Sequence, residues 1–256
     1  MKIITYNVNG IRAAMKKGLV DWLATHPADV ICIQETKANH DDVDKAVIEK
    51  LGYETYWFSA QKKGYSGVAI FTKVKPDKVI YGTGHTLSDA EGRVIRADIG
   101  KVSVINAYFP SGTSGDERQS YKYVWLNEFL DYVNDLKKKR KQLIVVGDYN
   151  IAHKEIDIHD PKGNKNSSGF LPEERAWMDI WIQAGFVDTF RQLHPETKGA
   201  YSWWSQRFPS VRLNNKGWRI DYICATENLK KNIKNAAIFP DVKHSDHCPV
   251  YAEFEL

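Results

Sequence analysis

The sequence predicts an α/β protein, because short apolar runs typical of buried strands alternate with segments of helical periodicity. Residues 2–6, 12–26 and 30–34 read as strand, helix and strand. Residues 117–140 carry aromatic and aliphatic side chains at helical spacing, and the apolar run 143–147 follows directly. No linker rich in Gly, Ser or Pro divides the 256 residues, so we expect one domain spanning residues 1–256.

The remaining elements follow from the same periodicities. β-rich runs are expected at 54–59, 67–73, 78–82, 93–99 and 102–108. One stripe of the long helix gathers Tyr121, Val124, Trp125, Phe129, Tyr132, Val133 and Leu136. After a loop at 153–170, Pro172 opens a helix through about Ala184, because proline suits the first helical turn. Two α/β halves are completed by strands near 201–204, 219–225, 236–239 and 249–255.

The composition is that of an ordinary globular protein, with 43% hydrophobic and 27% charged residues. No apolar run approaches the roughly 18 residues of a membrane helix, so no membrane partner is expected. A strand begins at residue 2, which leaves no room for a targeting segment. Cys32, Cys224 and Cys248 are far apart and lie in apolar runs, so we expect buried, reduced thiols and a cytoplasmic location.

The net charge of +4 permits binding to a polyanion but does not establish it. The basic run 137–141 closes the predicted long helix, where cations interact favourably with the helix dipole. A solvated helix end is therefore the simpler interpretation of this run, and a nucleic-acid patch is the alternative. Better candidates for such a patch are Arg12, Lys16 and Lys17, together with Lys62 and Lys63.

Acidic and amide residues recur where apolar runs begin or end. They are Asn7, Glu35, Asp148, Asn150, Asp221, Asp246 and the neighbouring His247. Taken singly, each is more simply a turn residue or a solvated side chain. Strand ends of one sheet share a rim, however, so residues far apart in sequence can meet there. Carboxylate and amide oxygens with one imidazole are typical of a Mg²⁺- or Mn²⁺-assisted phosphoryl hydrolase.

Seven motifs, in order along nearly the whole chain, resemble the exonuclease III family of apurinic/apyrimidinic (AP) endonucleases, within the wider endonuclease/exonuclease/phosphatase fold. They are Asn7-Val8-Asn9-Gly10-Ile11-Arg12, Gln34-Glu35-Thr36-Lys37, Gly64-Tyr65-Ser66-Gly67-Val68, Tyr108-Phe109-Pro110-Ser111-Gly112, Gly147-Asp148-Tyr149-Asn150-Ile151-Ala152-His153, Gly217-Trp218-Arg219-Ile220-Asp221-Tyr222 and Ser245-Asp246-His247-Cys248-Pro249. The resemblance implies a four-layer α/β sandwich, in which two packed mixed β-sheets are flanked by helices.

The implied activity is Mg²⁺-dependent incision of duplex DNA 5′ to an abasic site, with Mn²⁺ as a plausible substitute. It would leave a 3′-hydroxyl and a 5′-deoxyribose phosphate, and a 3′→5′ exonuclease or 3′-phosphodiesterase activity is expected beside it. A monomer is expected to act on double-stranded DNA. Two alternatives stay open: another phosphodiesterase of the same fold, for lipid or inositol phosphates, and a catalytically silent DNA-binding relative.

The resemblance also implies residue roles. The implied metal ligands are Asn7, Glu35, Asp148, Asn150, Asp246 and His247, with Glu35 as the principal carboxylate. The implied catalytic group is Tyr108, Asp148, Asn150, Asp221 and His247. Asp148 would orient or deprotonate the attacking water, and His247, paired with Asp221, would act as a base or as a phosphate-binding cation.

Aromatic residues narrow the implied substrate. Trp203, Trp218 and Ile220 match the pocket that accepts a flipped abasic sugar, although tryptophans of the protein core are the alternative interpretation. The positions that match contacts to the DNA backbone are Arg12, Lys17, Gly64, Tyr65 and Asn164. Such phosphate contacts predict strong salt dependence and little sequence preference.

Overall fold

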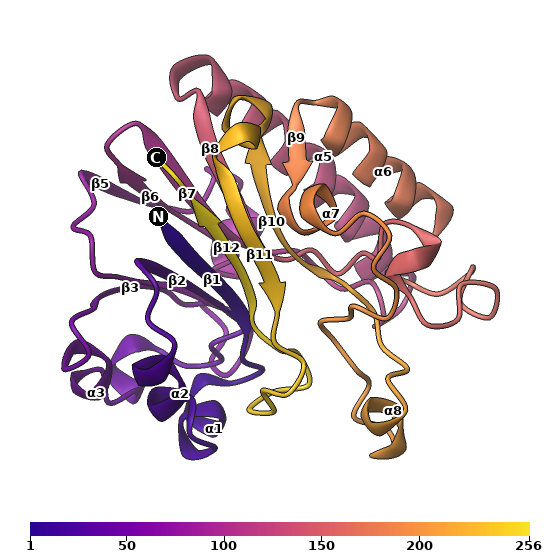
Figure 1. Cartoon of the computed structure of the whole chain (residues 1–256), viewed down its shortest axis with the longest axis horizontal. Coiled ribbons are helices and arrows are strands. Elements are labelled where there is room, and N and C mark those ends of the chain that lie inside the picture. The colour runs from indigo at the N-terminus through magenta and orange to yellow at the C-terminus, as the bar shows by residue number, and fades with distance from the viewer.

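The computed structural model describes residues 1–256 and contains two six-stranded sheets (Figure 1). The first sheet has the spatial order β11 (Ile233–Ile238), β12 (Val250–Phe254), β1 (Lys2–Asn7), β2 (Val30–Gln34), β4 (Val68–Thr72) and β3 (Glu54–Phe58). The second has the order β5 (Lys78–Tyr81), β6 (Val94–Ile99), β7 (Val102–Tyr108), β8 (Gln142–Asp148), β10 (Asp221–Thr226) and β9 (Phe186–Asp188).

Helices cover the outer face of each sheet (Figure 1). On the first sheet they are α1 (Ile11–Lys16), α2 (Leu19–Thr25) and α3 (Ala46–Glu49), and on the second α5 (Asp116–Lys139) and α6 (Pro172–Gln183). Shorter helices are α4 (Thr86–Ala90), α7 (Thr189–Leu193) and α8 (Ser210–Leu213), with 3₁₀ turns at His40–Asp42, Glu155–Asp157 and Glu227–Asn232. The prediction of a four-layer α/β sandwich is confirmed. None of these helices has both the length and the apolar character needed to cross a bilayer.

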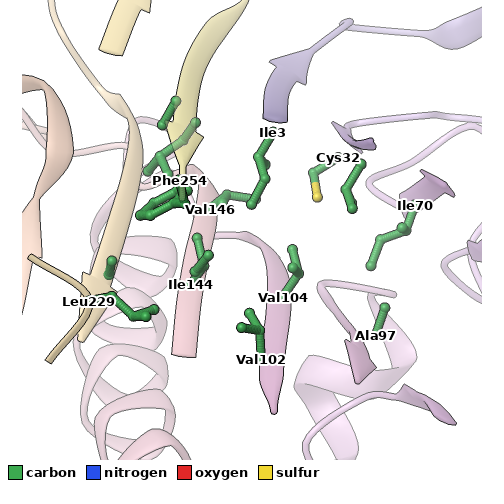
Figure 2. Packing of buried hydrophobic residues seen from close by; sticks show 14 of the residues in the cluster. Ile3, Cys32, Ile70, Ala97, Val102, Val104, Ile144, Val146, Leu229 and Phe254 are labelled. Atoms are coloured by element: carbon green, nitrogen blue, oxygen red, sulfur yellow. The ribbon is translucent and has the colours of Figure 1, made fainter. Parts of the chain in front are cut away.

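The central core lies between the two sheets, where side chains from both inner faces meet (Figure 2). Successive strand residues point to opposite faces, so Ile3 enters this core while Ile4 packs under the helices of the first sheet. Cys32 of the first sheet and Val146 of the second sheet both point into this core. Full burial of one such aliphatic side chain stabilises the fold by about 1.5–3 kcal/mol. The three cysteines are free and buried, as predicted.

The outer layer of the second sheet is aromatic. On α5 the buried stripe runs through Trp125, Phe129 and Val133, and Trp181 of α6 packs against Phe129 with ring centroids 5.9 Å apart. Val124 was expected on this stripe but is 55% exposed. It lies five positions before Phe129, and because this offset does not match the helical repeat of about 3.6 residues, Val124 turns away from the sheet.

Several elements differ from the prediction. The helix expected over 12–26 is split, because Gly18 adopts a left-handed φ of 92° between α1 and α2. The strand expected at 201–204 is absent, since Trp203 forms only isolated bridges to Trp218 and His247. The short strand β9 was not predicted. The two halves also exchange strands, because β11 and β12 join the first sheet beside β1 and bring the two termini close together (Figure 1).

Two buried amides connect the sheets near one rim. Asn106 of β7 donates through Nδ2 to the carbonyl oxygens of Ile33 (3.0 Å) and Ala69 (2.8 Å) in the first sheet. Gln34 of β2 donates through Nε2 to Oδ1 of Asn106 at 2.6 Å. Each such bond contributes about 1 kcal/mol net, and together they fix the register between the sheets. The ends of β1 and β2 are thereby held opposite the ends of β7 and β8.

Candidate active site

The predicted site residues converge because strands of both sheets end or begin at the same rim. In the second sheet, Tyr108 and Asp221 both pair with Asp148 in the strand register, so these three residues form one row across β7, β8 and β10. In the first sheet, Asn7 pairs with Gln34, and Glu35 follows immediately. The expectation of a rim belonging to one sheet is therefore corrected, because the two packed sheets contribute together.

A cleft of about 890 Å³ opens at this rim. Among its lining residues are the predicted Glu35, Tyr108, Asp148, Asn150, Asn164, Trp203, Trp218, Ile220, Asp246 and His247. Asn7 and Asp221 are buried and bond to residues that line it. Outside the lining lie Arg12, Lys17, Gly64 and Tyr65.

Asn7 links the carboxylates contributed by the two sheets. Its Nδ2 donates to Glu35 Oε2 at 3.1 Å and to Asp148 Oδ2 at 2.9 Å. Its Oδ1 accepts a hydrogen bond from the backbone N–H of Asn9 at 2.9 Å, which is consistent with this orientation of the amide. Glu35 and Asp148 are thus held on either side of one amide nitrogen.

A buried chain of ionisable groups lies beside Asp148. His247 Nδ1 is 2.9 Å from Asp221 Oδ2, and its Nε2 is 3.8 Å from Asp148 Oδ2. Burial raises the pKa of Asp148 to about 7, although the charge of His247 opposes this rise. Burial disfavours the charged form of His247, but the carboxylates of Asp221 and Asp148 outweigh it and raise the pKa of this imidazole to about 10. His247 is therefore a cation at neutral pH.

Ser202 holds Asp221 in place and was not predicted as a site residue. Its hydroxyl donates to Asp221 Oδ2 at 2.7 Å and accepts from the backbone N–H groups of Ile220 and Asp221, each at 3.1 Å. Ser202 is completely buried. Ser202 precedes Trp203 in the sequence, which was the available signal. The sequence pattern did not indicate that its hydroxyl bonds to Asp221 in another segment.

Lys37 is a second residue that the prediction missed. Its Nζ lies 2.9 Å from Glu35 Oε1 and donates to Asn9 Oδ1 at 2.6 Å. Its position within the motif Gln34-Glu35-Thr36-Lys37 was the available signal. Asn9 in turn donates through Nδ2 to Asp246 Oδ1 at 2.9 Å, so Lys37 and Asn9 connect the carboxylates of Glu35 and Asp246.

Strained backbone is concentrated around these residues. Six non-glycine residues have positive φ, and five of them are in or next to the segments just described: Asn9, Glu35, Lys37, Ser66 and Asn150. Glu35 has a φ of 56°, which costs on the order of 1 kcal/mol for such a side chain. The carbonyl oxygen of Glu35 accepts from Gly10 N at 2.8 Å, which offsets part of this cost. Such strain persists where surrounding contacts over-determine the conformation.

Asn150 occupies the turn that follows β8, with a φ of 52°. Its backbone N–H donates to Asp148 Oδ1 at 2.8 Å. Its Nδ2 donates to Phe109 O at 2.9 Å and to Asp148 Oδ2 at 3.2 Å. The turn therefore presents an amide donor beside the buried carboxylate. The neighbouring Tyr108 is neutral, because burial and the nearby Glu35 carboxylate raise the pKa of its phenol well above its ordinary value.

Two of the tryptophans form a wall of the cleft. Trp203 and Trp218 are half-buried, and their rings meet edge to face with centroids 5.9 Å apart. Ile220 packs in the same apolar cluster. Each of the two tryptophans thus packs on a small buried cluster and also lines the cleft, whereas the neighbouring Trp204 is a core residue at 2% exposure. The cleft thus has a polar, acidic side and an aromatic side.

Of the five predicted DNA contacts, one lines the cleft and four do not. Arg12 and Lys17 are exposed at α1, and Asn164 lies in the cleft lining. Gly64 is exposed with a φ of 70°. The hydroxyl of Tyr65 accepts hydrogen bonds from Arg93 at 3.2 Å and from Arg118 at 3.1 Å, which fixes this ring near Tyr108.

The donor set fits a hard divalent cation. Glu35, Asp148 and Asp246 bring carboxylate oxygens to one cleft together with amide groups, which are the ligand types preferred by Mg²⁺ and Mn²⁺. Ligand atoms of Asp148, Asp221 and His247 also lie within 4.8 Å of one another. Asp221 is buried behind the cleft and accepts from Ser202 and His247 through Oδ2, whereas Glu35 and Asp148 line the cleft. A cation in the cleft would therefore meet the Glu35–Asp148 side.

Comparisons with known proteins agree with this geometry. The family model for the endonuclease/exonuclease/phosphatase family matches residues 4–247. An exodeoxyribonuclease of Bacillus subtilis is 46% identical over 251 residues, covering 98% of each chain. A 3′ phosphatase from Neisseria, solved with a product DNA hairpin, has a TM-score of 0.93 at 30% identity. An AP endonuclease from Archaeoglobus fulgidus has a TM-score of 0.92 at 31% identity, and both structural matches cover 100% of both chains.

The resemblance inferred from the seven motifs is confirmed by these matches, and so is the expectation of a phosphodiester-cleaving hydrolase. The family model alone spans most of the chain, and the Bacillus relative extends the match almost to both ends. The chain belongs to the endonuclease/exonuclease/phosphatase family.

Proposed function

We propose that the protein is a Mg²⁺-dependent DNA repair phosphodiesterase that incises duplex DNA 5′ to abasic sites. The observation that carries this proposal is that one cleft joins the carboxylates of Glu35 and Asp148 to the aromatic wall of Trp203 and Trp218. Metal-assisted phosphodiester cleavage needs the two carboxylates, and the aromatic wall is the second feature. An abasic sugar, which has lost its base and its stacking, suits the second.

The metal site consists of Glu35 as the principal carboxylate, with the remaining ligands drawn from Asn7, Asp148, Asn150 and Asp246. His247 was also expected among the ligands, but a protonated imidazole has no lone pair to offer a metal. When bound, Mg²⁺ would offset the charge of the phosphate and of the leaving 3′ oxygen. Mn²⁺ accepts the same oxygen ligands and is a plausible substitute. With either metal Asn7 helps to position the two carboxylates, because it holds Glu35 and Asp148 on either side of its amide nitrogen.

Asp148 holds the attacking water and accepts its proton. Its pKa of about 7 suits a general base near neutral pH. At that pH part of the carboxyl group is ionised, and the ionised form is basic enough to accept a proton. The water oxygen forms a bond to phosphorus as the bond from phosphorus to the 3′ oxygen breaks. The products are a 3′-hydroxyl, which takes its proton from solvent, and a 5′-deoxyribose phosphate.

His247 binds the phosphate as a cation. The sequence left open whether it acts as a base or as a cation. A pKa of about 10 favours the cation, because a protonated imidazole has no free lone pair to accept a proton. Asp221 positions the ring through Nδ1. Tyr108 donates a hydrogen bond to a phosphate oxygen as charge develops there. Asn150 donates in the same way by releasing the 3.2 Å bond from its Nδ2 to Asp148 Oδ2.

Trp203, Trp218 and Ile220 form the abasic pocket. Their apolar surfaces accept the face of the sugar, whereas a nucleotide that keeps its base would need far more room. Arg12, Lys17, Gly64, Tyr65 and Asn164 hold the DNA backbone without reading sequence. Similarity to the Neisseria 3′ phosphatase supports an additional activity on 3′ ends, either as an exonuclease or as a 3′-phosphodiesterase.

A single domain spanning the chain acts as a monomer, since the cleft is built from one copy. The three free, buried cysteines support a reducing, cytoplasmic compartment.

The test uses a labelled duplex with one tetrahydrofuran abasic analogue, and a matched duplex with an ordinary nucleotide at that position. In Mg²⁺ we expect a nick immediately 5′ to the analogue, at a rate at least 100-fold above any internal nicking of the matched duplex. EDTA should abolish it, and Mn²⁺ should restore it. Equal nicking of both duplexes would overturn the abasic specificity, and no cleavage of either by folded protein would overturn the proposal.

A further inference from the structure

A buried ion pair lies behind the cleft and has no part in the site described so far. Lys122 of α5 and Glu174 of α6 are both completely buried, and Nζ lies 2.5 Å from Oε1. A pair removed from water in this way gives little net stability, because the loss of solvation offsets the attraction. Burial lowers the pKa of Lys122, and the Glu174 charge opposes this shift. Stability alone therefore does not explain why two charged side chains are buried at this place.

Lys122 reaches the turn that follows β8. Its Nζ donates to the backbone carbonyl oxygen of Asn150 at 2.8 Å. The N–H and the side chain of Asn150 are tied to Asp148 and Phe109 on the other side. Because Asn150 has a left-handed φ, its carbonyl lies outside the sheet ladder, and a charged donor is a strong partner for it.

Glu174 reaches the loop before α6. Its Oε2 accepts from Gly169 N at 2.6 Å and from Leu171 N at 3.0 Å. Gly169 has a φ of 94°, and a Cβ placed there would lie 3.0 Å from the Trp218 ring and 3.2 Å from the Asn150 carbonyl oxygen. The loop therefore fits between the turn at Asn150 and the aromatic wall of the cleft.

A role in capping α6 explains only part of these contacts. Glu174 stands at the third position of α6 and bonds to Leu171 N, as in a capping box. Capping of α6 requires neither the bond from Gly169 N to Glu174 nor a buried lysine beside Glu174. The contact from Lys122 to Asn150 joins a different helix to a different segment.

We infer that Lys122 and Glu174 form a positioning pair that fixes the Asn150 turn relative to the Trp218 wall. This inference rests on the proposed function, because it assigns the pair to the alignment of catalytic groups with the abasic pocket. Lys122 restrains the turn, Glu174 restrains the loop, and the ion pair joins the two restraints. A misplacement of about 1 Å between such groups can cost on the order of 100-fold in rate.

The test replaces both charges at once. Lys122→Met or Glu174→Gln alone would leave one buried charge unpaired and should destabilise the protein strongly. The double variant Lys122→Met/Glu174→Gln removes both charges, keeps an oxygen for Gly169 N and nearly conserves volume. Lys138→Met is the matched control, since it makes the same change on α5 at a side chain that is 75% exposed.

We expect the double variant to melt within about 5 °C of wild type. Single-turnover incision of the tetrahydrofuran duplex should slow on the order of 10- to 100-fold. The Kd for that duplex should change less than threefold, and the control should match wild type throughout. Wild-type incision by a folded double variant would overturn the inference.

Hydrogen exchange gives a readout that needs no activity. We expect exchange in residues 148–152 of the double variant to rise at least tenfold, with exchange in the central turns of α5 unchanged. Unchanged exchange in residues 148–152 would overturn the inference. Failure of the proposed function is distinguishable, because wild type would then leave the tetrahydrofuran duplex intact while the exchange comparison still decides the role of the pair.

Discussion

The indole Nε1 of Trp203 donates a hydrogen bond to Oδ2 of Asp246 at 3.0 Å. A side chain predicted for the abasic pocket thus bonds to a carboxylate predicted for the metal site. Burial alone would raise the pKa of Asp246, but the charge of His247 and hydrogen bonds from Asn9, Trp203 and Ser245 lower it. The aromatic and acidic sides of the cleft are therefore coupled through this bond.

Trp203→Phe tests this coupling, because it keeps an aromatic wall and removes the indole donor. We expect the Mg²⁺ concentration for half-maximal incision to rise about 10-fold, while the rate at saturating Mg²⁺ stays within about threefold. The control is Trp204→Phe, whose Nε1 bonds to Asn215 at 3.1 Å, away from the carboxylates. An unchanged Mg²⁺ dependence in Trp203→Phe would contradict a role for Asp246 at the metal.

Ser202→Ala tests the support of Asp221. The substitution removes the donor to the carboxylate and leaves the N–H groups of Ile220 and Asp221 without their acceptor. We expect the free energy of unfolding to fall by about 1–3 kcal/mol, measured by urea denaturation. Ser210→Ala, at an exposed serine of α8, should leave it unchanged. A variant as stable as wild type would show that Ser202 is dispensable for the fold around Asp221.

Stability in acid should depend on Asp157, which anchors the segment that carries the pocket. Burial alone would raise the pKa of Asp157, but the guanidiniums of Arg219 and Arg191 hold it at about 2. Arg219 stands between Trp218 and Ile220, and its N–H donates to Asp157 O at 2.7 Å. A pKa lowered from 3.8 to about 2 contributes about 2 kcal/mol of stability, which is present above pH 4 and lost as the pH falls through 2.

Asp157→Asn should therefore be less stable than wild type at pH 7, and the difference should shrink by about 2 kcal/mol between pH 4 and pH 2. The measurement is the free energy of unfolding at each pH for both proteins. A difference that does not change with pH would show that Asp157 is not held ionised by its two arginines.

Binding to DNA should depend on Arg12 and Lys17 more than on the basic end of α5. We expect Arg12→Ala and Lys17→Ala each to weaken binding to duplex DNA and to reduce the slope of log K against log salt by about 1. Lys139→Ala, at an exposed position in the run 137–141, should leave the slope unchanged. A larger effect from Lys139 would favour the nucleic-acid interpretation of that run.

Much of the site was predictable because its residues interrupt apolar runs. Glu35 directly follows β2 and Asp148 is the last residue of β8, and a shared rim explains carboxylates at both places. The exchange of β11 and β12 into the first sheet was not predictable, because strand periodicity does not determine which sheet a strand joins. Lys122 was hidden for a similar reason: a lysine among helical residues is normally solvated, and its burial depends on a partner from α6.

The most direct test of the catalytic rim is single-turnover incision of the tetrahydrofuran duplex by wild type and by Asp148→Asn, with binding of the same duplex measured in parallel. We predict that the substitution lowers the rate by at least 1,000-fold, because a general base alone contributes on the order of 10²–10⁴-fold and Asp148 also serves the metal site. Binding should change less than about fivefold. Near-normal incision by Asp148→Asn would contradict the assignment of this rim as the active site.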